Sequence, residues 1–455
     1  MADLSINMCG IKSPNPFWLA SAPPTNTGEQ IMRAFDAGWG GAVWKTLGNP
    51  IVNVSSRFGA VSYGSKQVMG FNNIELITDR PLETNFKEIT EVKKKYPNNA
   101  VIVSIMVESK DEWREIIKRS VDTGADGLEL NFGCPHGMCE RGMGSAVSAE
   151  PKVLKEITQW AMEYSSIPVL VKLSPNTSNI LDAAIPAAEA GADGISLINT
   201  IKSIIGVDLD SLTPKPVVGD ASTNGGYCGP AVKPIALHLL SAIAREPRVN
   251  LPISGIGGIS NWKDAAEFLA LGATSVQVCT AVMHHGYRIV EDMIDGLSEY
   301  LDSKGMKSVN ELIGQAVPKY KEWGDLDINH KVVAKIDEEK CIGCQLCYKA
   351  CLDGAHQCIH THSEPCEAYH GESDHGMNPR CTVETPILHS DSGLKNNRIP
   401  TIDEAECIGC NLCSLVCPVD DCITMQVVNP LPKETWNDRI IKGTNHVPGG
   451  MSELK

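Results

Sequence analysis

Gly124-Ala-Asp-Gly-Leu-Glu-Leu-Asn-Phe-Gly-Cys-Pro135 is the stretch on which the fold prediction depends. A glycine turn leads into an apolar run over 127–132, typical of a buried strand, and the strand breaks at Cys134-Pro135. A glycine-rich loop follows as far as Gly144, and we expect it to close over a ligand. An amide, Asn131, and a thiol, Cys134, at a strand's end suit a reaction on a flat polar ligand. The alternative is a packed cysteine before an ordinary loop.

The same unit recurs through the first three hundred residues. Helical patterns end in a glycine turn, as at Ala190-Gly-Ala-Asp193, and a short apolar run follows. Such runs fit strands that are buried on both faces of a parallel sheet. The predicted strands are 17–21, 42–46, 100–106, 127–132, 168–174, 194–200, 251–255 and 275–281. Eight such units predict an α/β fold, a (β/α)8 TIM barrel over 1–307, with a doubly wound sheet as the alternative.

Polar residues are predicted at the carboxyl ends of these strands, where such barrels place their chemistry. Two of them are lysines, Lys45 and Lys172, and packing alone does not account for both. Lys172 lies in an otherwise apolar strand, and a buried cation needs a partner such as a negatively charged reduced flavin. Ser254-Gly-Ile-Gly-Gly-Ile259 follows the seventh strand and is expected to cradle a phosphate with backbone N–H groups. Simple turn glycines are the alternative.

Composition and net charge bear on the partners and the location of the protein. The 455 residues carry 55 acidic and 40 basic side chains, for a net charge of −15. This charge argues against nucleic acid and anionic membrane as partners, because both are polyanions. The N-terminus has no signal-peptide pattern, and no apolar run approaches the ~20 residues that span a bilayer. We therefore expect a cytoplasmic location.

Cysteines are concentrated near the C-terminus, with twelve of 17 between Cys341 and Cys422. They include two C-x2-C-x2-C-x3-C runs, the bacterial ferredoxin pattern for two 4Fe-4S clusters, whereas zinc sites usually use cysteine pairs. The fourth cysteine of each run is expected to bind the other cluster. The predicted ligands are Cys341, Cys344, Cys347 and Cys417 for one cluster, and Cys407, Cys410, Cys413 and Cys351 for the other.

The ferredoxin-like α+β domain is predicted over 336–425, after a helical connector over 308–335 and before a polar tail over 426–455. An insertion at 358–394 separates the two cysteine runs and holds five of the twelve histidines, together with three further cysteines. It is interpreted as a solvated loop with spare thiols, and a further metal site is the alternative.

Several motifs resemble one flavoprotein family along nearly the whole chain. Asn131-x-x-Cys-Pro135 is similar to the fourth-strand motif of the FMN domain that class-1 dihydroorotate dehydrogenases and dihydropyrimidine dehydrogenases share. The continuation to Gly144 resembles the dihydropyrimidine branch. Asn73-Ile-Glu-Leu76, Asn199-Thr200 and Gly229-x-x-x-Lys-Pro-Ile-Ala-Leu237 resemble the same branch.

The resemblance implies an FMN site and a pyrimidine site in the barrel. FMN is expected to contact Ala20, Ser21, Lys45, Thr46, Asn131, Lys172, Asn199, Gly229, Gly257, Gly258, Cys279 and Thr280. The pyrimidine is expected to contact Asn73, Glu75, Asn131, Asn199 and Thr200, whose groups match ring C=O and N–H. Cys134 falls on the family's general acid. Two positions depart from the family pattern: Gly133 replaces a serine, and Cys139 replaces a glycine in the expected lid.

The implied reaction is the reduction of uracil or thymine, with hydride from FMN to C6 and a proton from Cys134 to C5. No predicted strand leads into a dinucleotide-binding G-x-G-x-x-G turn. Electrons are therefore expected to enter through the clusters from a partner subunit with FAD that oxidises NAD(P)H, and a homo-oligomer within that hetero-oligomer is expected. The alternatives are a reductase of dihydroorotate or another cyclic amide, and a ferredoxin-like electron carrier with a vestigial barrel.

Overall fold

The computed structural model describes residues 2–49, 52–63, 66–135, 142–361, 398–428 and 431–444. They form two compact units, Met1–Tyr320 and Lys321–Lys455, and each is described here by itself. Cys139 and most of the predicted lid lie outside the described residues, as does the predicted insertion after Thr361.

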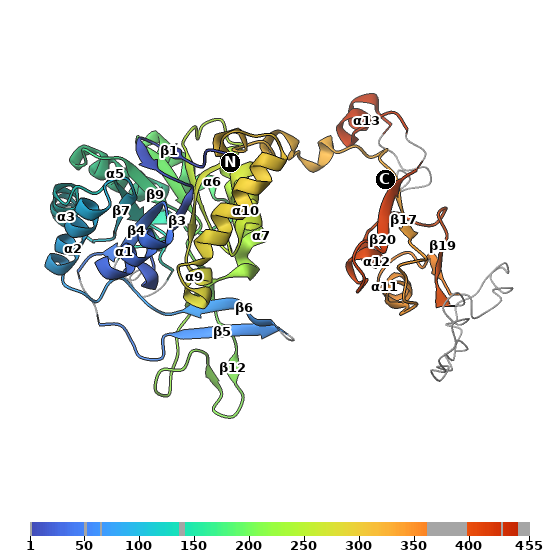
Figure 1. The fold of residues 1–455 in the computed structure, drawn as a ribbon, viewed down its shortest axis with the longest axis horizontal. Helices are drawn as coiled ribbons and strands as arrows, with labels where there is room; N and C mark the ends of the chain where they lie inside the picture. The colour runs from blue at the N-terminus through green and yellow to red at the C-terminus, as the bar shows by residue number, and fades with distance from the viewer. Residues whose placement is uncertain are drawn as a thin grey trace, which may run out of the picture. The chain divides into compact units, whose positions relative to one another are not determined.

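Eight parallel strands close into a barrel in the first unit (Figure 1). In chain order they are β3 (Phe17–Leu19), β4 (Gly41–Leu47), β7 (Ala100–Ile105), β8 (Gly127–Asn131), β9 (Val169–Lys172), β10 (Gly194–Leu197), β15 (Ile253–Ile256) and β16 (Ala273–Val278). Each pairs with the next, and β16 returns to β3. The TIM barrel prediction is confirmed, because every predicted run overlaps one of these strands.

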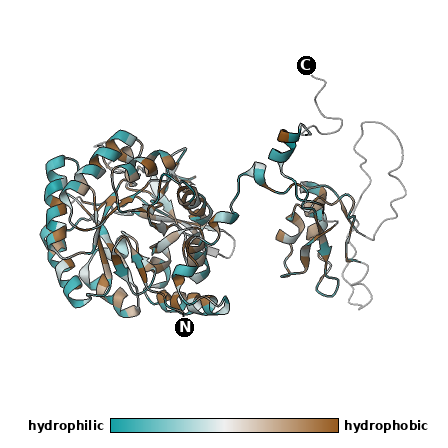
Figure 2. Ribbon diagram, turned by 90° about the horizontal axis from the view of Figure 1, so that it is seen from above, coloured by the Kyte–Doolittle hydropathy of each residue, from teal (hydrophilic) through white to brown (hydrophobic). Residues whose placement is uncertain are grey.

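Helices surround the barrel. They are α1 (Gly28–Ala37), α2 (Leu82–Lys95), α3 (Lys110–Asp122), α4 (Ser145–Ser148), α5 (Pro151–Tyr164), α6 (Leu181–Glu189), α7 (Lys233–Ala244), α8 (Trp262–Ala270), α9 (Thr280–His285) and α10 (Ile289–Ser303). Their outer faces are hydrophilic (Figure 2), and their inner faces pack on the strands. Among the described residues, every helix is too short or too polar to cross a lipid bilayer.

The two ends of the barrel are closed differently. The hairpin of β1 (Ile6–Met8) and β2 (Ile11–Ser13) covers the N-terminal end, where Ser275 Oγ lies 3.0 Å from Met8 Sδ. At the carboxyl end lies an antiparallel sheet in the order β11-β14-β6-β5, here called the cover sheet, which is not among the predicted elements (Figure 1). Its strands are β5 (Phe58–Tyr63), β6 (Lys66–Asn73), β11 (Ile201–Ser203) and β14 (Gly225–Cys228), and the hairpin β12 (Val207–Asp208) and β13 (Thr213–Pro214) adjoins it in the chain.

The segment after the last barrel helix differs from the prediction. It contains the 3-10 turns η4 (Val309–Glu311), η5 (Val317–Lys319) and η6 (Trp323–Asp325) and the strand β17 (Val332–Ile336), with no α-helix over 304–345. Gly314 N and Ala316 N donate to carbonyls at the end of α8, 2.9 and 2.8 Å away. Because these bonds attach the segment to the barrel, the first unit extends past residue 307. Over 308–335, where a helical connector was expected, the structure has three 3-10 turns and the start of a strand.

The second unit is a small α+β fold. β17 pairs antiparallel with β20 (Ile423–Val427), and β18 (Ile359–His360) pairs with β19 (Thr401–Ile402). Its helices are α11 (Leu346–Gly354), α12 (Leu412–Leu415) and α13 (Trp436–Lys442). The C-terminal segment packs within its own unit, since Trp436 and Trp323 have ring centroids 6.2 Å apart and Ile328 N donates to Glu434 O over 2.9 Å.

A glycine sets the approach of α10 to α8. A Cβ at Gly296 would lie 2.1 Å from Cδ1 of Trp262, whose ring also packs on Tyr300. Alanine in a helix interior is normally favoured over glycine by about 1 kcal/mol. Here overpacking outweighs that gain, so we expect Gly296→Ala to lower the free energy of unfolding of the barrel by about 1–2 kcal/mol, measured by urea denaturation with tryptophan fluorescence.

Glu299→Ala is the control, because Glu299 is exposed on the same helix. It should stay within about 0.5 kcal/mol of the wild type. A Gly296→Ala protein as stable as the wild type would show that the Trp262 side chain can move aside without lowering the free energy of unfolding.

Candidate active site

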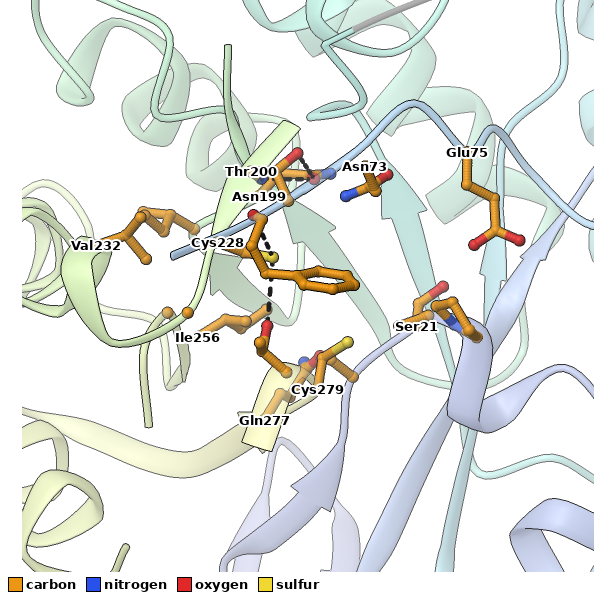
Figure 3. Close-up of a pocket in the computed structure, with 18 of the residues that line it drawn as sticks. Ser21, Asn73, Glu75, Asn199, Thr200, Cys228, Val232, Ile256, Gln277 and Cys279 are labelled. Carbon is orange, nitrogen blue, oxygen red and sulfur yellow. Dashed lines mark hydrogen bonds between the residues drawn. The ribbon is translucent and has the colours of Figure 1, made fainter. Parts of the chain in front are cut away.

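A cavity of about 1130 Å³, including its mouth, opens at the carboxyl ends of the barrel strands. Its lining includes Cys134 and every residue predicted to contact FMN or the pyrimidine. Figure 3 shows Asn199, Thr200 and Asn73 near one another, with Glu75 farther along the same connecting segment as Asn73.

Amides and hydroxyls at the strand ends form one connected chain of hydrogen bonds. Asn131 Nδ2 donates to Thr46 Oγ1 over 3.0 Å, and Asn199 Nδ2 donates to Asn131 Oδ1 over 3.0 Å. Thr200 N donates to Asn199 Oδ1 over 2.8 Å, and the Thr46 hydroxyl lies 3.1 Å from Ser21 Oγ. Each amide is thereby fixed by its neighbour, and the chain presents rigid donors and acceptors to a flat ligand.

Gly133, where the resemblance implies a serine, has little space for a side chain. A Cβ at this position would lie 2.4 Å from Cβ and 2.7 Å from Nδ2 of Asn199. A serine would therefore displace Asn199 from its bond to Asn131. The glycine keeps the amide chain intact, at the loss of one hydroxyl in the site.

The cover sheet and the segment that follows β6 bring further polar groups to the cavity. Asn73 Nδ2 donates to Gly226 O over 3.2 Å, and a Cβ at Gly226 would lie 2.1 Å from Thr200 Oγ1, which places Asn73 and Thr200 on either side of one backbone. Glu75 Oε1 accepts from Lys45 Nζ over 2.7 Å and from Arg57 Nη1 over 2.9 Å. Arg57 was not predicted, although it is the only basic residue between 52 and 63.

Lys172 has a protein partner that the sequence analysis missed. Its Nζ lies 3.3 Å from Glu129 Oε1, with both side chains buried. Glu129 Oε2 accepts from Ser196 Oγ over 2.8 Å and from Gln277 Nε2 over 3.0 Å. The alternation of Glu129 and Asn131 with two leucines is a period-two signal for the inward face, and it could have identified Glu129 as a barrel-interior residue.

Backbone surrounds another part of the cavity. Gly257 and Gly258 have φ of +130° and +74°, a region that residues with a Cβ rarely adopt. A Cβ at Gly258 would lie 2.8 Å from Gly229 O and 2.9 Å from Lys233 N, so two loops meet there main chain to main chain. Such a cradle of main-chain groups fits a phosphate and has no room for a side chain.

Three thiols among the described residues line the cavity. Cys134 packs with Ile77, Met106 and Met143, and Ser145 N donates to its carbonyl over 2.9 Å. Thr280 Oγ1 donates to Cys228 Sγ over 3.2 Å, yet burial raises the pKa of Cys228 to about 11. Burial also raises the pKa of Cys279. Both of these thiols therefore stay protonated at neutral pH.

The second unit holds two smaller cavities lined by cysteines. One, of about 330 Å³, is lined by Cys341, Cys344, Cys347 and Cys417. The other, of about 350 Å³, is lined by Cys351, Cys407, Cys410 and Cys413. Each set matches the predicted ligands of one cluster. In the described part of the chain, no three His, Cys, Asp or Glu side chains converge on a single-ion position.

Burial raises the pKa of Cys347 and of Cys413 to about 11. Binding of iron needs thiolates, so assembly of a cluster in either cavity must release protons. Two more cysteines line these cavities, Cys422 in the first and Cys358 in the second. The sequence analysis gave Cys422 no role and placed Cys358 in a solvated loop, whereas the structure buries it.

The buried pair of Glu129 and Lys172 generates a prediction about stability. Glu129→Gln leaves the Lys172 ammonium buried without a negative partner, so the free energy of unfolding should fall by about 3–5 kcal/mol in urea denaturation. Adding Lys172→Met should recover part of this loss, because no buried charge remains.

The exposed pair of Lys155 and Glu189 is the control, with a shorter N–O distance of 2.7 Å. Glu189→Gln should cost less than about 1 kcal/mol, because water already solvates both groups. Equal losses in the two single variants would show that burial does not set the energy of the Glu129 pair.

In comparisons with known proteins, each of the two units matches a protein-family model. The family model described as dihydroorotate dehydrogenase matches residues 3–301, and the 4Fe-4S binding domain model matches 334–351 and 400–420. The NAD-dependent dihydropyrimidine dehydrogenase subunit PreA of Escherichia coli strain K12 is 44% identical over 359 residues, which cover 78% of this chain and 87% of that one.

Two further relatives extend the comparison. The chloroplastic dihydropyrimidine dehydrogenase (NADP(+)) of Arabidopsis thaliana is 41% identical over 337 residues, 71% of this chain and 79% of that one. The catalytic subunit of dihydroorotate dehydrogenase B (NAD(+)) of Pyrococcus abyssi is 35% identical over 322 residues, 69% of this chain and 99% of that one. The chain therefore belongs to the dihydroorotate dehydrogenase family, close to its dihydropyrimidine dehydrogenase members, and is an oxidoreductase that acts on CH–CH groups.

Proposed function

We propose that this chain reduces the 5,6 double bond of uracil or thymine, with FMN and two 4Fe-4S clusters as cofactors. The observation that carries the proposal is the amide chain from Asn131 to Thr200, which shares one cavity with Asn73, Glu75 and Cys134. Amides and a carboxylate at fixed positions match the alternating C=O and N–H groups of a pyrimidine edge. The names of the bacterial and plant relatives support the same substrate class.

The cavity residues fit FMN. The main-chain cradle at Gly229, Gly257 and Gly258 suits its phosphate, and Lys172 offers a buried positive charge for its ring system. Ala20, Ser21, Thr46, Cys279 and Thr280 line the same cavity, and we assign them to FMN contact with Lys45, Asn131 and Asn199. When bound there, FMN supplies hydride to C6 of the pyrimidine.

The side chains of the chain then orient the ring and move one proton. Asn73, Asn131, Asn199 and Thr200 hold the pyrimidine edge through hydrogen bonds, and the cover sheet restricts water at the carboxyl ends of the strands. Glu75, fixed by Lys45 and Arg57, accepts a ring N–H. Cys134 donates a proton from its thiol to C5.

Electrons are proposed to reach the barrel through the clusters. Cys341, Cys344, Cys347 and Cys417 hold one cluster, and Cys407, Cys410, Cys413 and Cys351 hold the other. A partner subunit with FAD would oxidise NAD(P)H. The E. coli relative is named as a subunit of an NAD-dependent enzyme, which supports this arrangement.

Dihydroorotate oxidation is the second candidate, favoured by the archaeal relative that covers 69% of this chain. Anaerobic purification with flavin and iron quantified, followed by assays with uracil, thymine and dihydroorotate, separates the two. Turnover of dihydroorotate without turnover of uracil would overturn the proposal.

Cys134→Ala tests the proton donor. The variant should retain flavin, seen in its absorbance spectrum, and lose uracil turnover about 10²–10⁴-fold with an artificial reductant, because general acid catalysis contributes about that factor. Cys9→Ala is the matched control, since Cys9 lies between β1 and β2 at the opposite end of the barrel. Wild-type turnover in Cys134→Ala would remove this cysteine from the mechanism.

Gly258→Ala tests the phosphate cradle. The added Cβ meets backbone atoms that cannot move aside, so FMN should bind at least about tenfold more weakly, while riboflavin, which lacks the phosphate, should be affected less. Gly191→Ala is the control: it has a similar φ of +90° with open space around its Cβ. Fluorescence titration of the flavin-free protein measures both affinities, and equal weakening for the two flavins would place the phosphate elsewhere.

A further inference from the structure

Each cysteine-lined cavity of the second unit contains a fifth thiol beyond the four assigned as cluster ligands. Cys358 belongs to the cavity of Cys351, Cys407, Cys410 and Cys413. Cys422 belongs to the cavity of Cys341, Cys344, Cys347 and Cys417. Both are buried, at 5% and 2% exposure. A 4Fe-4S cluster has four irons, and four thiolates occupy them all, so a fifth thiol has no iron to bind.

The two thiols stand in the same relation to their ligands. Cys358 Sγ lies 3.6 Å from Cys351 Sγ, and both line one cavity with Cys407. Cys422 lines the other cavity together with Cys417 and Cys341. In each case the extra thiol shares a cavity with the fourth cysteine of one run and the first cysteine of the other, which are ligands of the same cluster in the proposed assignment.

Main-chain bonds hold both thiols in register with the ligand loops. Asp403 N donates to Cys358 O over 2.8 Å, and Cys407 N donates to Asp403 O over 3.0 Å. The other half repeats the pattern around Asp337, which donates to Cys422 O over 2.8 Å and accepts from Cys341 N over 2.9 Å. The repetition in two separate chain segments indicates that the thiol positions are built into the fold.

Resting on the two-cluster assignment above, we propose that Cys358 and Cys422 donate S–H···S hydrogen bonds to the cluster ligands and raise the reduction potential of each cluster. A cysteine bound to iron is a thiolate, which accepts hydrogen bonds and cannot donate them. The added electron makes the cluster more negative, so a donor at its sulfurs stabilises the reduced form more than the oxidised form.

Cys422 has a competing acceptor. Its Sγ lies 3.7 Å from Asp337 O, so this carbonyl competes with the ligand sulfurs for its proton. The equivalent bond of Cys358 goes to the Cys351 sulfur at 3.6 Å. We therefore expect the larger effect from Cys358.

The test is a potentiometric titration of the anaerobically purified full chain with dithionite, followed by electron paramagnetic resonance. Cys358→Ala should shift the reduction equilibrium of one cluster about tenfold toward the oxidised form, which is 59 mV for a one-electron couple. Cys358→Ser should keep most of the wild-type potential, because its hydroxyl also donates. Cys422→Ala should lower the potential of the other cluster by less, and Cys9→Ala should change neither.

A vibrational measurement on the wild type does not depend on any variant folding. Exchange into D₂O replaces S–H by S–D and should shift the iron–cysteine stretching bands in the resonance Raman spectrum. The shift should be smaller in Cys358→Ala.

The outcomes separate this inference from the proposed function. Wild-type protein without iron and sulfide would refute the cluster assignment itself. Clusters at unchanged potential in both alanine variants would refute the hydrogen bonds alone. Loss of four irons per chain in Cys358→Ala, with retention of all irons in Cys351→Ala, would make Cys358 a ligand and overturn the inference.

Discussion

The buried pair of Glu129 and Lys172 is the constraint on which the barrel site depends. A carboxylate inside a barrel is costly unless opposite charge and hydrogen bonds surround it. Glu129 gains them from β9, β10 and β16, the strands that carry Lys172, Ser196 and Gln277. Because those partners lie on three different strands, satisfying one carboxylate also fixes where the lysine ammonium stands in the cavity floor.

The polar interior continues from that carboxylate toward the N-terminal end of the barrel, which the β1–β2 hairpin covers. Gln277 Nε2 also donates to Ser254 Oγ over 3.1 Å, and Ser254 Oγ lies 2.8 Å from Ser275 Oγ. A network of this kind leaves few alternative side-chain arrangements, since displacing one member leaves another buried without a partner. The barrel is therefore a rigid support for the amide chain and for the main-chain cradle at Gly257 and Gly258, whose positions depend on its geometry.

The sequence was sufficient for the barrel strands and for the residues at their ends, because continuous apolar runs and glycine turns are local signals and the barrel topology brings the strand ends together. It did not predict the cover sheet. There β14 pairs with β6, with Gly226 opposite Asn73 across more than one hundred and fifty residues, and neither strand has a strong apolar pattern. Glu129 and Arg57 were missed for a related reason: their importance comes from partners on other strands. Cys358 and Cys422 lie outside the spaced runs, so only their position identifies them.

The pairing of β18 with β19 has a consequence for how this protein can vary. Ile359 faces Ile402 and His360 faces Thr401. The segment between the two cysteine runs therefore starts and ends at one short strand pair. Doubling the length of a loop between fixed ends costs only about 0.6 kcal/mol of closure entropy. A longer or shorter segment between β18 and β19 should therefore change the stability of the second unit little and leave the two cysteine-lined cavities in place.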